Sequence, residues 1–162
     1  MRRWRKIVTV LVVLGLASAT ALAVALQYDS ACPTVLGPGR GTTTMKALQR
    51  RCYGGPERLA IEEVSTPDVA DDAVLVKVHA AAVNPLDWHY MRGKPYVMRF
   101  ESGFGTPKDV RMGVDFAGTV EAIGKSVTRF KIGDRVFGLA NGALAEYVAV
   151  RESRTIAAIP EQ

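Results

Sequence analysis

The segment from His79 to Gly93, HAAAVNPLDWHYMRG, gathers side chains that donate or accept protons. Asn84 precedes a proline, which favours an extended backbone and leaves its carboxamide free to form hydrogen bonds at the turn. Asp87 suits the first turn of a helix that starts there, and capping that helix is the simpler role for Asn84. His89 and Tyr90 then offer an imidazole and a phenol to a ligand. The segment predicts either a reactive corner or a capped helix.

The supply of metal ligands in this sequence is poor. A zinc site takes three or four Cys, His or carboxylate ligands, and the segment from residue 45 onward holds two histidines, His79 and His89, and one cysteine, Cys52. Asp115 could add a carboxylate, but no paired spacing supports it. We therefore expect no metal, and His79 is expected to be an ordinary hydrogen-bonded strand residue. No serine stands in a Gly-x-Ser-x-Gly turn, and no Gly-x-Gly-x-x-Gly follows a strand. The sequence thus predicts neither a serine hydrolase nor a dinucleotide-binding unit.

Positive charge is concentrated at the extreme N-terminus. The formal net charge is +5, and the opening MRRWRK supplies most of it. From Met45 onward there are 16 Lys and Arg against 15 Asp and Glu, a net charge of +1. This balance leaves no basic face for phosphate contacts, so we expect no nucleic-acid partner.

An uncharged stretch follows the basic cluster. Residues 7–26, IVTVLVVLGLASATALAVAL, are long enough to cross a bilayer as a helix. The basic end should remain cytoplasmic, which would place the rest of the chain outside the cytoplasm, away from the cytoplasmic NADPH pool. We predict a single-pass membrane anchor over residues 1–26. The alternative is a cleaved signal peptide and a secreted domain, because Ala17-Ser18-Ala19 offers a small-x-small cleavage pattern.

Residues 27–44 are predicted to be a flexible linker, since GPGRGTTT cannot bury enough apolar surface to fold alone. Cys32 lies within this linker and Cys52 near a strand end. The two could pair if the domain faced an oxidising compartment, but the linker position favours two free thiols, with Cys52 as a small apolar side chain.

From residue 45 to residue 162 the chain reads as one domain of short strands separated by turn residues. A single short helix is expected after Asn84-Pro85, and residues 94–112 form a long irregular loop of the kind that is functional or mobile. This pattern predicts a mainly β fold, a distorted and partly open antiparallel barrel. The expected strands are 45–52, 59–64, 73–83, 115–123, 135–139, 143–150 and 156–160.

Four ordered blocks carry a family resemblance: MKALQRRCYGGPERLAIEEV, VLVKVHAAAVNPLDWHYMRG, MGVDFAGTVEAIGKSVTRFKIGDRVFG and GALAEYVAV. Together they resemble the medium-chain dehydrogenase/reductase superfamily, in its zinc-independent quinone oxidoreductase branch, which includes the zeta-crystallin-like enzymes. The resemblance implies a GroES-like catalytic domain over residues 45–162. Zinc-dependent alcohol dehydrogenases place a cysteine ligand where this chain has Asn84 and a histidine where it has Val114, so the resemblance implies no zinc.

In that branch NADPH, or NADH, delivers hydride to a quinone or an α,β-unsaturated carbonyl. The resemblance implies that Asn84 and His89 contact the cofactor and that His89 and Tyr90 donate to the acceptor. A homodimer is one candidate assembly. Because the family's Rossmann domain has no counterpart in these residues, we expect a fragment that is inactive unless completed. The alternative is a non-catalytic, membrane-tethered barrel module that binds a partner or a small apolar ligand.

Overall fold

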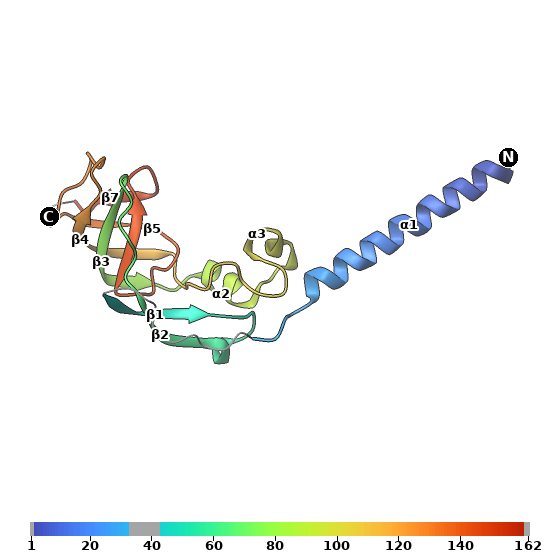
Figure 1. Ribbon diagram of the computed structural model, residues 1–162, viewed down its shortest axis with the longest axis horizontal. Helices are drawn as coiled ribbons and strands as arrows, with labels where there is room; N and C mark the ends of the chain where they lie inside the picture. Colours follow the sequence, from blue (N-terminus) through green and yellow to red (C-terminus); the bar gives the residue numbers. More distant parts are fainter. Residues whose placement is uncertain (1, 33–42, 161–162) are drawn as a thin grey trace.

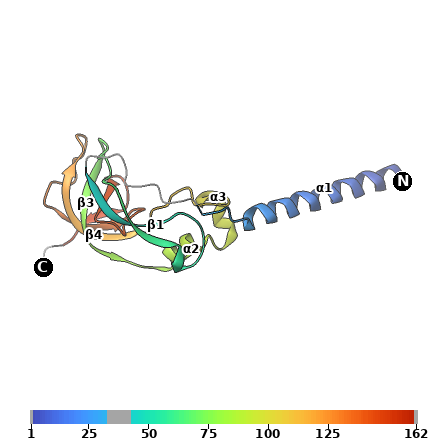
Figure 2. The ribbon, with the colours of Figure 1, turned by 60° about the horizontal axis from the view of Figure 1, so that its bottom comes forward.

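The computed structural model describes residues 2–32 and 43–160, which form a long helix and a β-rich domain (Figure 1). Helix α1, Arg2–Gln27, has no buried residue and projects away from the domain in both ribbon views (Figures 1 and 2). It is long and apolar enough to cross a membrane, and a signal sequence passes the same test. Its insertion into a bilayer therefore stays a prediction.

The described residues contain seven strands in two antiparallel sheets, so the prediction of a mainly β domain is confirmed. A two-stranded sheet pairs β1 with β2, and a 3-10 turn, η1, joins the two strands. A five-stranded sheet has the order β6-β3-β4-β5-β7 and stays open between β6 and β7. The bounds are β1 Thr44–Arg50, η1 Pro56–Arg58, β2 Leu59–Ser65, β3 Ala73–Ala82, β4 Asp115–Ile123, β5 Arg135–Leu139, β6 Tyr147–Arg151 and β7 Ile156–Ala158.

The hydrophobic core lies against one face of the five-stranded sheet. Alternate residues of a strand share a face, so Val74 and Val76 of β3 both point into the core and are fully buried. Val120 of β4, Val136 of β5 and Val148 of β6 complete its centre. Burial of each valine side chain stabilises the fold by about 1.5–3 kcal/mol, and their branched Cβ atoms suit the extended backbone.

The five-stranded sheet bends instead of lying flat. The register of β3 against β4 shifts twice, between Leu75 and Val76 and again between Val78 and Ala80, and such irregularities increase local twist. Gly118 permits this close pairing, because a side chain there would collide with the carbonyl of Lys77.

Single bridges join β1 to the rest of the domain, so that the two sheets are held together. Ala47 of β1 pairs with Ala145, and Gln49 pairs with Arg111. The segment before β6 therefore lies between β1 and β3. The strand itself starts at Tyr147, whereas the sequence predicted a start at residue 143.

Residues 85–105, here called the helical lobe, lie between the sheets and α1 (Figure 1). The lobe contains α2, Pro85–Arg92, the 3-10 turn η2, Tyr96–Met98, and α3, Arg99–Ser102. The expected short helix after Asn84-Pro85 is thus present. The expectation of an irregular loop over 94–112 was wrong in its first part, where η2 and α3 form local structure and Arg99 of α3 packs over the ring of Tyr53.

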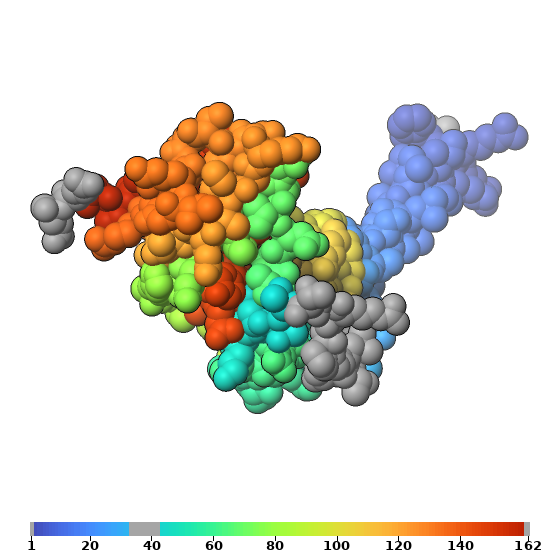
Figure 3. Space-filling model, turned by 60° about the vertical axis from the view of Figure 1, so that its left-hand side comes forward, coloured from blue at the N-terminus to red at the C-terminus, as the bar shows by residue number. Residues whose placement is uncertain are grey.

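The chain after α1 is docked onto the helical lobe, which differs from the flexible linker predicted for 27–44. Asp29 forms a bridge with Gly105, and the Ser30 amide donates to the Gly105 carbonyl at 3.1 Å. Figure 3 shows the atoms of the lobe, in yellow, beside the root of α1, in blue. Residues 33–42 of the predicted linker lie outside the described residues.

Cys32 and Cys52 form a disulfide with a Cα–Cα distance of 5.2 Å, so the prediction of two free thiols was wrong. That prediction assumed that Cys32 moves with a free linker. Docking of the preceding residues instead brings Cys32 to the end of β1, where Cys52 is buried.

Candidate active site

Asn84 stands at the N-terminus of α2 and caps it. Its Oδ1 accepts from the Leu86 amide at 2.7 Å, and Asp87 Oδ2 accepts from the Asn84 amide at 3.0 Å. With Pro85 in the first turn, this reciprocal arrangement is a complete capping box. The capping role that the sequence left open for Asn84 is therefore present, and it contributes about 1 kcal/mol to the helix.

The same Asn84 side chain also joins α2 to the sheet. Its Nδ2 donates to Asp115 Oδ2 at the first residue of β4. The oxygen and the nitrogen of the carboxamide are thereby both oriented, while Asp87 and Asp115 hold the geometry of the turn and the strand. Asp87 is only 3% exposed, and its second oxygen, Oδ1, has no hydrogen-bond partner in the described part of the chain.

A cleft of about 900 Å³ opens beside this corner. Asn84, Tyr90 and Asp115 line it together, along with Leu86 and Leu139. Its size suits a small-molecule ligand, for which pockets of about 300–1,000 Å³ are typical.

A narrower cavity of about 170 Å³ continues from the cleft into the domain, and Tyr90, Glu101 and Arg111 line both spaces. The inner end of this cavity reaches the buried side chains of Arg50 and Asp87. The cleft therefore has an open mouth, and its inner end carries buried ionisable side chains.

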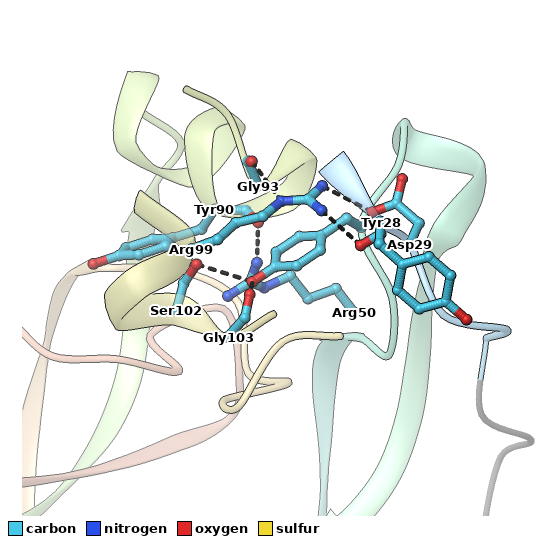
Figure 4. A network of polar contacts seen from close by, with 9 residues as sticks. Tyr28, Asp29, Arg50, Tyr90, Gly93, Arg99, Ser102 and Gly103 are labelled. Carbon is cyan, nitrogen blue, oxygen red and sulfur yellow. Dashed lines mark hydrogen bonds and ion pairs between the residues drawn. The ribbon is translucent and has the colours of Figure 1, made fainter. Parts of the chain in front are cut away.

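The Arg50 side chain holds the backbone of Tyr90 in place. Its guanidinium donates to the Tyr90 carbonyl and lies 5.4 Å from the centre of the Tyr90 ring (Figure 4). Burial lowers the pKa of Arg50 from its ordinary value, while Tyr53 and Asp109 oppose the change. Because the Tyr90 backbone is held in this way, its phenol has a defined place on the cleft wall.

Arg111 and Asp109 form an ion pair where the two cavities meet. Arg111 Nε and Nη2 donate to the two Asp109 oxygens at 2.9 and 2.7 Å. Burial acts to raise the pKa of Asp109, but the hydrogen bonds from the Arg111 side chain and amide outweigh it, so the pKa lies below its usual value. The pair thus presents fixed charges to the cleft near neutral pH.

His89 lies apart from Asn84 and Tyr90. Its Nδ1 donates to the Lys94 carbonyl at 2.7 Å, its ring contacts Trp88 edge-on, and it lines neither cavity. Its predicted contacts with cofactor and acceptor stay predictions. His79, by contrast, bonds through Nε2 to Thr119 Oγ1 at 3.0 Å, as expected for a strand histidine.

The charged residues inside the cleft were missed by the sequence-based predictions. Arg50, Glu101 and Arg111 come from three separate segments, and no spacing in the chain marks them as neighbours. Arg50 carried the one available signal in the sequence, a charged residue near the end of a predicted strand. Within residues 2–32 and 43–160, no group of three or more His, Cys, Asp and Glu side chains could hold a metal ion.

Comparison with known proteins agrees with this fold. Residues 70–161 match the alcohol dehydrogenase GroES-like domain. The chain is 40% identical over 124 residues to a chloroplastic quinone-oxidoreductase homolog from Spinacia oleracea, covering 72% of this chain and 36% of that protein. It is 37% identical over 119 residues to the 2-methylene-furan-3-one reductase of Solanum lycopersicum, covering 67% and 29%.

A solved mycobacterial structure in complex with NADPH superposes with a TM-score of 0.60 at 29% identity, covering 72% of this chain and 33% of that one. This chain therefore spans about a third of the length of these proteins. It belongs to the alcohol dehydrogenase GroES-like domain family, in the quinone oxidoreductase branch of the medium-chain dehydrogenases/reductases, and corresponds to their N-terminal part.

Proposed function

We propose that this chain supplies the GroES-like catalytic half of an NAD(P)H-dependent oxidoreductase that reduces quinones or α,β-unsaturated carbonyls without zinc. The observation that carries the proposal is the cleft at the start of α2, which Asn84 and Tyr90 both line. The positions that hold cysteine and histidine ligands in zinc-dependent relatives are Asn84 and Val114 here, neither of which is a zinc ligand.

The cleft residues fit one side of a nicotinamide cofactor. Asn84 Nδ2 carries a second N–H beyond the one given to Asp115, and it would hold the cofactor beside its nicotinamide and ribose. Leu86 and Leu139 offer apolar surface to a flat ring. When bound, the cofactor supplies the hydride. Tyr90 would donate a hydrogen bond to the acceptor oxygen, which gains negative charge during the reduction.

The proposal is tested on the protein as its gene encodes it, by following NADPH oxidation with a quinone and with an enone in the presence of a strong chelator. Activity that survives chelation supports a zinc-free site. Activity that is lost on chelation and restored by zinc would overturn that part of the proposal.

Asn84 provides a residue-level test. Serine caps helices about as well as asparagine, so Asn84→Ser should keep the helix cap and lose only the Nδ2 donor. The lost bond to Asp115 should lower stability by about 1 kcal/mol, and the absent donor should weaken NADPH binding. Asn84→Ala should weaken binding and also lose about 1 kcal/mol of cap stability. Unchanged NADPH affinity in Asn84→Ser would leave Asn84 as a turn residue only.

We further propose that α1 anchors the domain on the non-cytoplasmic side of a membrane, where the reductase would use nicotinamide cofactor present on that side instead of the cytoplasmic pool. Two features support this placement: the basic N-terminus ahead of an uncharged helix, and the disulfide, since disulfides persist in oxidising compartments. Protease added to right-side-out membrane vesicles should digest the domain. Protection of the domain until detergent is added would reverse the orientation.

An apolar cavity is the observation that favours the non-catalytic alternative. It has a volume of about 500 Å³ and lies between β1, β2 and β3, lined by residues that include Leu48, Ile61 and Val78. Binding of a small apolar ligand there, together with absent NADPH binding, would favour a binding module over an oxidoreductase.

A further inference from the structure

The helical lobe carries large apolar side chains that nothing in the described chain covers. Val97 of η2 is 64% exposed, Phe100 of α3 is 51% exposed, and Phe104, just after α3, is 47% exposed. The two phenylalanine rings contact each other edge to face at 5.5 Å between centroids. The three residues fall within one short segment, which makes a local apolar surface rather than scattered exposure.

This surface lies at the root of α1. Tyr28, the first residue after the helix, is exposed and lies close to Gly105. Asp29 and Ser30 pair with Gly105, next to Phe104. In Figures 1 and 2, the helical lobe is the part of the domain nearest to the end of α1, and η2 of this lobe contacts α1.

The root of α1 is also held firmly against the lobe. Arg99, 1% exposed, forms an ion pair with Asp29 at 2.8 Å and donates to the Tyr28 carbonyl at 3.1 Å and the Gly93 carbonyl at 3.0 Å (Figure 4). The disulfide from Cys32 to the end of β1 is a covalent second attachment. These links prevent the lobe from swinging away from the point where α1 ends.

We propose that the helical lobe rests on the lipid bilayer that α1 enters, with Val97, Phe100 and Phe104 in the interface between headgroups and acyl chains. The inference depends on the proposed membrane anchor. Because Tyr28 and Asp29, the first two residues after α1, already contact the lobe, a helix that ends at the membrane surface brings Val97, Phe100 and Phe104 to that surface.

The chemistry around the surface fits a phospholipid interface. Tyrosines such as Tyr28 concentrate at that depth of a membrane, where one side is apolar and the other wet, and phenylalanines such as Phe100 lie on the buried face of interfacial segments. Lys94 and Lys108 are exposed at the margins of the lobe and suit headgroup phosphates. A consequence for the site is that α3 presents Phe100 to the membrane while the next residue, Glu101, lines the cleft.

The test measures the depth of single tryptophans with phosphatidylcholine whose acyl chains carry bromine, which quenches tryptophan on close approach. The whole chain is reconstituted in these vesicles after Trp4→Phe and Trp88→Phe, and Phe100→Trp then serves as the reporter. The matched control is Phe137→Trp on β5, at the opposite end of the molecule in Figure 1, because Phe137 is 48% exposed. A third protein, with Trp88→Phe alone, keeps Trp4 as a reporter of α1 insertion.

We expect loss of emission in the Phe100→Trp variant and none in the Phe137→Trp variant. Quenching of Trp4 without quenching of the Phe100→Trp variant would overturn the inference while leaving the anchor intact. Equal quenching at both reporter positions would overturn lobe-specific docking. Absence of quenching for Trp4, with protein that does not float with the vesicles, would refute the anchor and this inference together.

Discussion

Replacing Arg99 tests whether the root of α1 is clamped to the domain. Arg99→Met keeps much of the side-chain length and the buried apolar stem but removes the guanidinium. That group makes one ion pair and two hydrogen bonds to carbonyls, and it stacks 4.3 Å from the Tyr53 ring centre and 5.1 Å from that of Tyr96. The variant therefore leaves the Gly93 carbonyl without its donor in a region that water reaches poorly.

The size of the effect follows from burial. Asp29 is 58% exposed and water can solvate it after the pair is broken, so the loss comes mainly from the Arg99 side. Loss of charge-assisted hydrogen bonds at about 1.5–3 kcal/mol each, with partial compensation by water, gives about 3–5 kcal/mol. For a domain of this size that corresponds to a fall in melting temperature on the order of 10 °C.

Thermal unfolding is followed by circular dichroism in detergent without reductant, for wild type, Arg99→Met, Arg99→Lys and Asp29→Asn. Lysine keeps the charge, but its single ammonium group cannot bind all the partners of the planar guanidinium. The melting temperature of Arg99→Lys should therefore lie between those of wild type and Arg99→Met. Asp29→Asn should cost less than Arg99→Met. A shift of only about 1–2 °C in Arg99→Met, or a larger effect in Asp29→Asn, would refute the clamp.

Three further predictions concern stability. Cys52→Ser, or reductant, should lower stability by about 3 kcal/mol, since the disulfide spans 20 residues; a thiol titration of the unreduced protein that finds two free thiols would contradict it. The pKa of Asp109 lies below its unfolded value because of Arg111, so the ionised carboxylate stabilises the fold. This stabilisation is present above about pH 4 and is lost as the pH falls through the folded pKa. In Asp109→Asn, the free energy of unfolding should therefore fall less steeply as the pH is lowered. Gly93→Ala should lower the melting temperature, because Gly93 has φ +59° and a side chain would meet the Tyr53 ring; an unchanged value would contradict the left-handed C-cap of α2.

The sequence located most of the secondary structure and the corner at Asn84. Alternation of apolar residues placed β3 and β4 nearly to their observed bounds, because a strand must put every second side chain into the core. Asn84-Pro85 with Asp87 marked the start of α2, because capping uses residues within three positions of each other. Both signals lie within a few residues of the element they predict, so rules based on short sequence spacings predicted these elements correctly.

The arrangement of the site was decided by tertiary structure. His89 and Tyr90 are neighbours in the chain, yet only Tyr90 lines the cleft, because each residue of a helix points about 100° away from the last. Arg50 and Arg111 reach the same cavity from distant segments, and no sequence spacing records that meeting.

The root of α1 gives the clearest contrast. By itself the sequence determined that residues 7–26 form an uncharged helix and that glycine-rich residues follow it. Only the folded domain decided that Tyr28 and Asp29 dock on Arg99, 71 residues from Tyr28, and that Cys32 pairs with Cys52. Periodicity fixes which face of an element is apolar, whereas the partner of a polar or sulfur atom depends on where the rest of the chain has packed.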